Sequence, residues 1–274
     1  MSESRGYIVP IGGAEEKLKD RVILRRFAKV CGGRVAEIAV IPTASRLPET
    51  GRDYVRLFRD LKVRSVKLLD IRRRSDCERE ENLRIIERAD GVFMTGGDQM
   101  RLATTVGGTP VAEALQRRNR EGLHVAGTSA GAAFISTHMI AFGEDGPTPR
   151  FGMVTLSPGL GLTGRVVVDQ HFRQRNRLGR LLAAISYNPA MIGLGIDEDT
   201  AAFIAPDETV TVCGSGGITI VDPADVDYSS MDIANRKEPV SVIGLKLHVL
   251  ISGGTFNLVT RQATPGVAQA LAGG

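Results

Sequence analysis

The sequence predicts an α/β protein with a mostly parallel central sheet and helices on both faces of that sheet. Between Tyr7 and Gly127, apolar β-branched segments alternate with segments whose apolar residues recur at helical spacing. Three of the apolar segments are followed by glycine-bearing corners, at Gly12-Gly13, Gly96-Gly97 and Gly127–Gly131. In a parallel sheet such corners lie beyond the carboxyl ends of the strands, where binding sites form.

The first half of the chain is expected to contain short strands separated by helices. Strands are predicted at Tyr7–Ile11, Val35–Ile41, Val66–Ile71, Gly91–Met94 and His124–Gly127. Helices are predicted at Glu15–Val30, Pro48–Leu61 and Ser75–Ala89, and from Pro110 onward. Gly32-Gly33 would stop the first helix, and a capping box of Ser75 and Glu78 would open the third. Proline at the first position is typical of a helix start, as at Pro110.

After Thr137 the alternation of predicted strands and helices becomes less regular. Phe142–Thr163, with several glycines and prolines, is expected to be a long loop. A strand at Arg165–Val168, an arginine-rich helix to Tyr187 and a strand at Ile192–Ile196 should follow. From Ala201 onward, shorter alternating segments predict antiparallel strands that continue the same domain. Because the chain has no linker, internal repeat or low-complexity tract, one domain over residues 1–274 is expected.

The amino-acid composition argues against membrane, secreted and nucleic-acid-binding proteins. The 274 residues are 42% hydrophobic and 24% charged, as in an ordinary globular protein, and no apolar run reaches the length of a membrane span. The N-terminus lacks a signal-peptide pattern, and the three cysteines are widely spaced without a CxxC. A cytoplasmic protein with reduced thiols is therefore expected. The net charge of +4 comes without a nucleic-acid motif, which argues against nucleic-acid binding.

The segment Gly127-Thr128-Ser129-Ala130-Gly131 has the Gly-x-Ser-x-Gly form of a nucleophile elbow. An apolar strand leads into it and small, helix-compatible residues leave it, so Ser129 is predicted at the tip of a strand-to-helix turn. The N–H groups at the start of a helix favour developing negative charge. We therefore expect a serine hydrolase, with the N–H of Ala130 and one from the Gly96-Gly97-Asp98 turn forming the oxyanion hole.

A serine hydroxyl needs a neighbouring base and a third group that orients that base. Of the four histidines, His171 directly follows a predicted strand, whereas His124, His138 and His248 are expected to be structural. The third group is expected within Asp197-Glu198-Asp199, at another strand end, and position alone does not choose among the three. Asp169 is a rival, but a residue two before His171 would point away if the strand continues that far.

Arginines are concentrated after His171. At helical spacing, Arg173, Arg177 and Arg180 would share one face, and Arg175 would point elsewhere. Guanidinium groups bind carboxylates through two parallel hydrogen bonds, so a carboxylate clamp beside His171 is predicted. The alternative is a solvated helix face. The other cluster, Arg72-Arg73-Arg74, is expected to be a solvated loop.

Five segments together resemble the cyanophycinase family, in order from residue 7 to about residue 205. They are Gly12–Glu15, Ile41–Ser45, Gly96–Gln99, Gly127–Ala132 and Asp169-Gln170-His171-Phe172-x-x-Arg175-x-Arg177-x-x-Arg180. The last segment is the most specific. Cyanophycinases are similar in fold and catalytic serine to dipeptidase E, within the glutamine-amidotransferase-like (flavodoxin-like) α/β architecture.

The resemblance implies hydrolysis of cyanophycin, a poly-aspartate chain with arginine on each β-carboxyl, to β-aspartyl-arginine dipeptides. It implies Ser129 as nucleophile, His171 as base and Glu198 as the third member. The residues implied for substrate binding are Gln99, Asp169, Gln170, Arg175, Arg177 and Arg180. It also implies a homodimer and no metal or organic cofactor.

Other functions stay open from the sequence. A hydrolase of the dipeptidase E type would act on small aspartyl peptides, although the arginine series fits cyanophycinase better. A non-catalytic binding protein would retain the same fold. A thiol enzyme is disfavoured because the elbow carries serine. The residues do not decide between cleavage at chain ends and internal cleavage, and they do not define a dimer surface.

Overall fold

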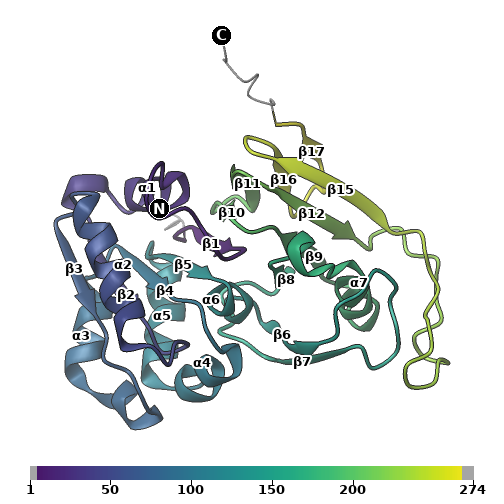
Figure 1. Cartoon of the computed structure of the whole chain (residues 1–274), viewed down its shortest axis with the longest axis horizontal. Helices are drawn as coiled ribbons and strands as arrows, with labels where there is room; N and C mark the ends of the chain where they lie inside the picture. The colour runs from purple at the N-terminus through teal and green to yellow at the C-terminus, as the bar shows by residue number, and fades with distance from the viewer. Residues whose placement is uncertain (1–4, 267–274) are drawn as a thin grey trace.

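The computed structural model describes residues 5–266, which form a large sheet and a smaller one with helices packed around them (Figure 1). Residues 1–4 and 267–274, which belong to the predicted domain of residues 1–274, lie outside the described residues.

Within the described residues, the large sheet has nine strands in the order β17-β16-β11-β10-β1-β5-β4-β2-β3. Its parallel part comprises β1 (Ile8–Ile11), β5 (His124–Thr128), β4 (Gly91–Met94), β2 (Glu37–Ile41) and β3 (Ser65–Leu68). Its antiparallel part comprises β10 (Thr200–Ile204), β11 (Thr209–Gly214), β16 (Thr255–Asn257) and β17 (Ala263–Thr264). The predicted class, a mostly parallel sheet with C-terminal antiparallel strands, is confirmed.

Helices cover both faces of the parallel part, as predicted. One face carries α1 (Val22–Val30) and α2 (Pro48–Asp60); the other carries α3 (Glu80–Arg88), α4 (Gln99–Val106), α5 (Pro110–Arg120) and α6 (Ala130–Phe134). Successive side chains of a strand point to opposite faces, so Phe93 packs on the first face and Met94 on the second. Phe93 contacts Phe27 and Phe58, with ring centroids 6.0 and 5.4 Å away. Truncating such a buried ring to alanine costs about 3–5 kcal/mol.

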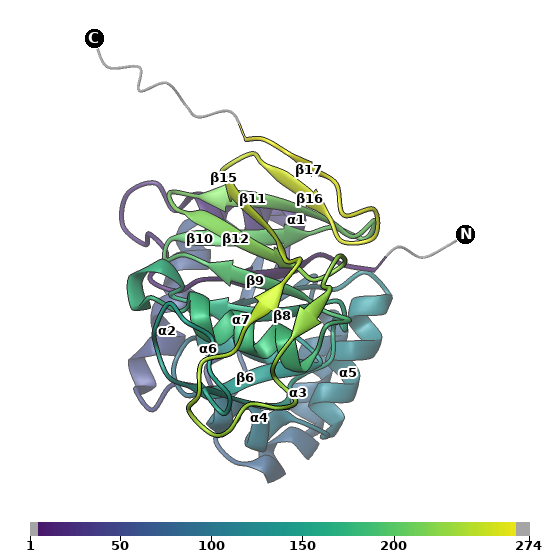
Figure 2. The ribbon, with the colours of Figure 1, turned by 90° about the vertical axis from the view of Figure 1, so that its right-hand side faces the viewer.

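The smaller sheet has the order β15-β12-β9-β8, and Figure 2 views the molecule from the side on which this sheet lies. Its strands are β8 (Val166–Gln170), β9 (Ile192–Ile196), β12 (Gly217–Asp222) and β15 (Lys246–Ile251), and only β8 and β9 are parallel. Helix α7 (Leu178–Tyr187) packs between this sheet and a hairpin of β6 (His138–Gly143) and β7 (Val154–Pro158). A further short pair joins β13 (Tyr228–Ser229) to β14 (Val242–Ile243). The chain therefore places the strand before His171 in a different sheet from the strand before Ser129.

Two predicted helices of the first half differ in the structure. The first begins at Val22 rather than Glu15, because Ala14 and Arg21 have left-handed backbone angles that an α-helix excludes. The capping box of Ser75 and Glu78 is wrong. A 3₁₀ turn occupies Arg74–Glu78, because the buried Asp76 carboxylate accepts the N–H groups of two residues just before the turn, and α3 starts at Glu80. A second 3₁₀ turn at Gly33–Val35 precedes β2.

The second half also contains corrections. The helix after Ser129 is short and ends at Phe134, and His138 opens strand β6. The predicted loop Phe142–Thr163 contains β7. The arginine-rich segment is not one helix: a 3₁₀ turn spans Arg173–Arg175, and Asn176 is left-handed before α7 begins at Leu178. The predicted common helical face of the arginines is therefore wrong.

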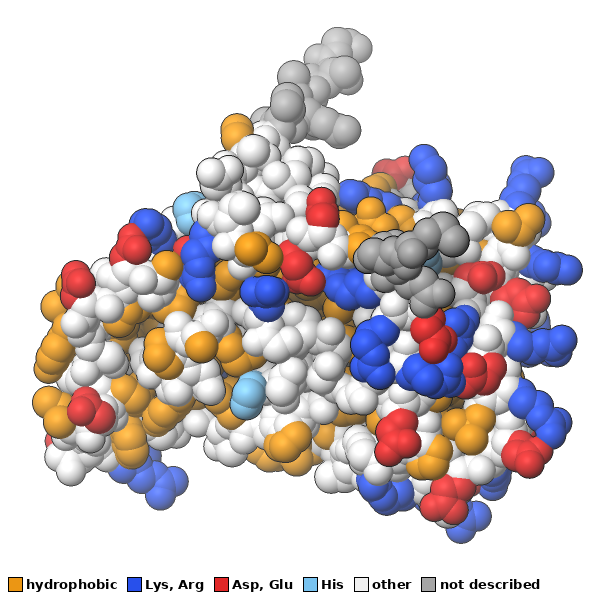
Figure 3. Space-filling model, turned by 180° about the vertical axis from the view of Figure 1, so that it is seen from behind, with side chains coloured by type: hydrophobic (Ala, Val, Ile, Leu, Met, Phe, Trp, Pro, Cys, Tyr) orange, Lys and Arg blue, Asp and Glu red, His pale blue; other side chains and the backbone are white. Residues whose placement is uncertain are grey.

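No helix in residues 5–266 is both long and apolar enough to cross a membrane. On the face of the molecule shown in Figure 3, Lys and Arg side chains are interspersed with Asp and Glu, most densely on the right. This surface mixes both signs of charge.

Candidate active site

Ser129 lies between the end of β5 and the start of α6, with φ 52° and ψ −109°. These angles lie outside the regions that L-residues ordinarily occupy, and such strain is typical of functional positions. The N–H of Ser129 donates to the carbonyl of Ile11 at 2.9 Å, which ties the turn to β1. Gly127 is required here, because a Cβ at this position would lie 2.4 Å from the carbonyl carbon of Gly131.

His171 and Glu198 complete a hydrogen-bonded series with Ser129. Ser129 Oγ lies 2.9 Å from His171 Nε2, and His171 Nδ1 lies 2.6 Å from Glu198 Oε1. His171 follows β8 and Glu198 follows β9, two parallel neighbours of the smaller sheet. This arrangement can move a proton from the serine hydroxyl to the imidazole, with the carboxylate holding the ring in the required tautomer.

The three acids after β9 have separate contacts. Asp197 Oδ1 accepts the N–H of Arg173 at 3.0 Å, and Asp199 Oδ1 accepts the N–H of Glu16 at 2.8 Å. Of the three, Glu198 is the one whose carboxylate contacts His171. The choice that sequence position left open is thus made by the direction of each side chain in this turn.

The Gly12-Gly13 corner after β1 lies against the imidazole. The N–H of His171 donates to the carbonyl of Gly12 at 2.8 Å, and the N–H of Asp199 donates to that of Gly13 at 2.9 Å. Gly13 has φ +99°, and a Cβ there would lie 2.4 Å from the His171 ring. A glycine is therefore needed for the ring to reach Ser129. This corner connects the larger sheet to the residues that follow β8 and β9.

Burial lowers the pKa of His171 below its ordinary value, and the positive charges of Arg175 and Arg177 act in the same direction. The hydrogen bond and charge of Glu198 oppose this shift without cancelling it. The imidazole is therefore neutral near pH 7, the form that can accept a proton.

Two backbone N–H groups close to Ser129 in the chain or in the fold are available as donors. Among the hydrogen bonds formed within residues 5–266, neither the N–H of Ala130 nor that of Gly97 has an acceptor. Gly96 is close to the serine: a Cβ built on it would lie 3.3 Å from the Cβ of Ser129. Gly97, at φ +145°, follows directly. Two free N–H donors near a serine hydroxyl can stabilise an oxyanion.

The predicted substrate-binding residues fall into two groups. Asp169 is buried and accepts from Arg180 Nε at 2.7 Å and from Nη2 at 2.5 Å. Arg177 is also buried; it donates to the carbonyl of Gln170 at 2.6 Å and to Asp145 at 3.1 Å. These three residues are paired with other protein groups, and whether they touch substrate stays a prediction.

The residues of the other group lie close to Ser129 or are more exposed. Gln170 Oε1 lies 3.4 Å from Ser129 Oγ, and Gln99 Nε2 donates to the carbonyl of Ala141 at 2.7 Å. Arg175 is exposed and forms no ion pair with any carboxylate in residues 5–266. Its guanidinium, close enough to His171 to lower the pKa of that imidazole, is free for an external carboxylate.

The remaining histidines lie elsewhere. His124 Nδ1 accepts the N–H of Tyr7 at 2.9 Å, and the His248 ring packs against Phe256 with centroids 5.4 Å apart. Among residues 5–266, no three His, Cys, Asp or Glu side chains are grouped so that they could hold a metal ion.

Comparison with models of known protein families shows to which family this chain belongs. The model of Peptidase family S51 matches residues 8–212. The chain belongs to peptidase family S51. It is thus a serine-type peptidase, and the matched range contains Ser129, His171 and Glu198.

Among curated proteins, this S51 peptidase is similar to the cyanophycinase of Synechococcus elongatus, with 46% identity over 95% of this chain and 82% of the relative. It is 44% identical to that of Trichormus variabilis, over 95% of this chain and 88% of the relative. Among solved structures, a peptidase from an acI-B1 Actinobacterium has a TM-score of 0.68 at 23% identity, covering 93% of this chain and 98% of the other. The structural likeness supports the α/β fold.

Two site residues of this S51 peptidase escaped the sequence analysis. Asp145, which accepts from Arg177, lies in the segment predicted as a loop, where no pattern marks it. Glu15 was assigned to a helix, yet its buried carboxylate accepts from the hydroxyls of Thr128 and Tyr54. The available signal was the Gly12–Glu15 segment, in which an acidic residue follows the Gly-Gly corner after one alanine.

Proposed function

We propose that this S51 peptidase is a cyanophycinase, which cleaves the poly-aspartate backbone of cyanophycin and releases β-aspartyl-arginine dipeptides. The observation that carries the proposal is the hydrogen-bonded series Ser129–His171–Glu198 in a chain 46% identical to a cyanophycinase over 95% of its length.

In the proposed mechanism Ser129, at a nucleophile elbow, attacks the α-carbonyl of a backbone aspartate while His171 Nε2 takes the hydroxyl proton. The N–H groups of Ala130 and Gly97 receive the oxyanion. The protonated imidazole then gives its proton to the leaving amine, and the C–N bond breaks. A water molecule, deprotonated by the same imidazole, hydrolyses the acyl-enzyme and restores Ser129. Glu198 stabilises the imidazolium that forms twice in this cycle.

We propose that Arg175 binds a free carboxylate of the substrate, and that Gln99 and Gln170 offer amide groups to the arginyl part. Each unit of cyanophycin carries one carboxylate and one guanidinium, so the site must receive both signs of charge. We propose that a buried group supports this pocket without touching substrate, because its members are already paired with one another: Asp169, Arg177 and Arg180. The buried ion pair of Asp169, at the end of β8, with Arg180 would hold the next two residues, Gln170 and His171, in place.

We also propose one peptidase domain, a homodimer and a cytoplasmic location. The site takes residues from both sheets, which supports a single functional unit. The three cysteines are buried as free thiols, as a reducing compartment allows. On β15, alternate residues Leu247, Val249 and Ile251 are 52%, 64% and 42% exposed, an aliphatic strip suited to a second copy. Light scattering of the purified protein would test the dimer.

Incubation of the purified chain with insoluble cyanophycin tests the function, with mass spectrometry of the soluble products. We expect β-aspartyl-arginine from the wild type and at least about 10⁴-fold slower release from Ser129→Ala. Cleavage of α-aspartyl dipeptides without attack on cyanophycin would instead assign a peptidase of the dipeptidase E type. Binding of the polymer without any product would assign a binding protein. The size distribution of the residual polymer distinguishes end trimming from internal cleavage.

A further inference from the structure

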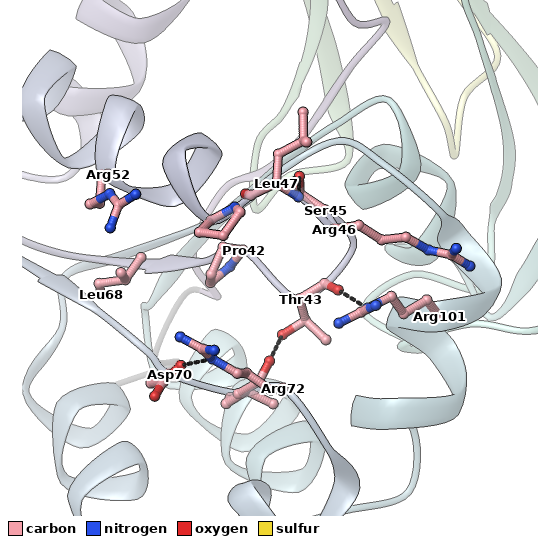
Figure 4. Close-up of a pocket in the computed structure, with 12 residues that line it drawn as sticks. Pro42, Thr43, Ser45, Arg46, Leu47, Arg52, Leu68, Asp70, Arg72 and Arg101 are labelled. Carbon is pink, nitrogen blue, oxygen red and sulfur yellow. Dashed lines mark hydrogen bonds and ion pairs between the residues drawn. The ribbon is translucent and has the colours of Figure 1, made fainter.

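A pocket of about 190 Å³ lies at the carboxyl ends of β2 and β3 (Figure 4). Its floor is formed by the Pro42–Ser45 turn after β2, and its sides by residues from α2, α4 and the segment after β3. Four arginines line it: Arg46, Arg52, Arg72 and Arg101. In Figure 4, Arg46 and Arg101 lie on one side of the Pro42–Ser45 turn, and Arg52 and Arg72 on the other.

The carboxylate of Asp70 neutralises only part of the positive charge of these four arginines. Asp70 accepts from Arg72 Nε at 2.8 Å, and Arg101 Nε donates to the carbonyl of Thr43 at 2.9 Å. Within residues 5–266, Arg46 and Arg52 form no ion pair with a carboxylate, and both are exposed. Four arginines and one carboxylate therefore line the pocket, an excess of positive charge that favours an anionic ligand.

The pocket lies on the same edge of the sheet as Ser129. Strand order at this edge is β5-β4-β2-β3, so the Gly96–Asp98 corner separates Ser129 from the Pro42–Ser45 turn. The N–H of Asp98 donates to the carbonyl of Ala44 at 2.9 Å, which joins the corner to the turn. With neighbouring strands about 4.8 Å apart, the pocket lies roughly 10–15 Å from the nucleophile.

We propose that this arginine-lined pocket is a distal subsite that binds the arginyl α-carboxylate of a cyanophycin unit remote from the bond being cleaved. This inference rests on the function proposed above. At about 3.3–3.6 Å per backbone residue, the pocket receives a unit roughly three to four residues from the scissile bond. Guanidinium groups bind carboxylates bidentately, and every unit of the polymer carries such a carboxylate. Whichever unit of the polymer lies at Ser129, another unit therefore presents a carboxylate to the pocket.

The volume fits this assignment. At about 30 Å³ per water molecule, 190 Å³ corresponds to roughly six waters, which is room for a carboxylate and the adjoining part of its chain. A short product such as a single dipeptide, held near Ser129, would not reach the pocket. The subsite thus provides affinity for long chains without contributing to the chemical step.

The test compares chain lengths. The double variant Arg46→Gln/Arg52→Gln removes the two unpaired cations, and Arg56→Gln, one helical turn further along α2 and paired with Asp53, serves as the matched control. Steady-state kinetics are measured with soluble oligomers of two and of at least six β-aspartyl-arginine units. We expect KM for the long oligomer to rise about 5- to 20-fold in the double variant, with kcat and the KM of the two-unit substrate unchanged. The control should match the wild type.

An unchanged KM for the long oligomer, or an equal rise for both oligomers, overturns the subsite. Absence of any cleavage by the wild type rejects the proposed function, and this subsite as a substrate site with it. A free anion is the other source of the same chemistry. If inorganic phosphate raises the melting temperature of the wild type and the Arg56→Gln control but not of the double variant, while KM stays unchanged, the pocket is a small-anion site and the proposal is overturned.

Discussion

Glu15 and Thr128 are 113 residues apart in the sequence, yet the Thr128 hydroxyl donates to Glu15 Oε2 at 2.6 Å. Thr128 directly precedes Ser129, and the other oxygen of Glu15 accepts from the hydroxyl of Tyr54 on α2. The Gly12-Gly13 corner before Glu15 contacts His171. The buried Glu15 carboxylate thus joins the residue before Ser129 to helix α2, two residues after the corner that contacts His171.

We expect Glu15→Gln to lower both stability and turnover. The amide replaces one acceptor by a donor that faces a hydroxyl, and an unsatisfied buried group costs about 1–3 kcal/mol. Urea unfolding and kcat measure the two effects. Thr128→Val, which removes one of the hydrogen bonds and keeps the shape, should produce a smaller loss in both. Equal kcat in Glu15→Gln and wild type would refute a positioning role.

Glu198→Gln should reduce kcat by about 10²- to 10⁴-fold with little change in stability, because an amide donor facing Nδ1 favours the wrong tautomer of His171. Asp199→Asn is the matched control, since asparagine tolerates the left-handed backbone at this position and the side chain does not contact His171. Similar losses in both variants would contradict the role given to Glu198.

The acid limb of kcat/KM should have its midpoint below about pH 6.5, the ordinary value for histidine. Burial and nearby arginines lower the pKa of His171, so the active neutral form persists to lower pH and is lost when pH falls through that pKa. Arg175→Gln removes one of the charges that lower the pKa, so the midpoint should move to higher pH. Arg173→Gln, whose guanidinium pairs with Asp197, should leave it unchanged. A wild-type midpoint above 6.5 would be inconsistent with this structure.

Asp169→Asn should destabilise the protein by about 3–5 kcal/mol, because Arg180 would remain buried without its carboxylate. Replacing both residues by leucine should recover part of that loss, since two buried charges are then removed together. The exposed pair of Arg84 and Glu80 provides the comparison: Arg84→Gln should cost at most about 0.5 kcal/mol. Urea denaturation gives all three values, and a loss below about 1 kcal/mol for Asp169→Asn would rule out a structural role for the pair.

Much of the fold could be predicted because its signals are local. Helix α2, strand β4 and the start of α5 at Pro110 match the predicted positions, since proline and apolar runs act over a few residues. The predicted helix start at Glu15 and the single helix through the arginine segment were wrong, because distant contacts override helical spacing at Glu15–Arg21 and at Arg173–Arg177. Asp199 holds the first segment through hydrogen bonds to Glu16 and Gly13, and Gly146, from the β6–β7 loop, holds the second.

The sequence by itself determined the α/β class, the serine turn and the histidine at a strand end. Each depends on residues adjacent in the chain, above all the glycines without which the Ser129 turn cannot close. Only the tertiary structure decided which acid contacts His171, which sheet holds β8 and β9, and that Asp169 is committed to Arg180. These outcomes depend on side-chain directions and strand partners. Spacing along one chain does not specify either, because any strand end can meet several others at the same edge.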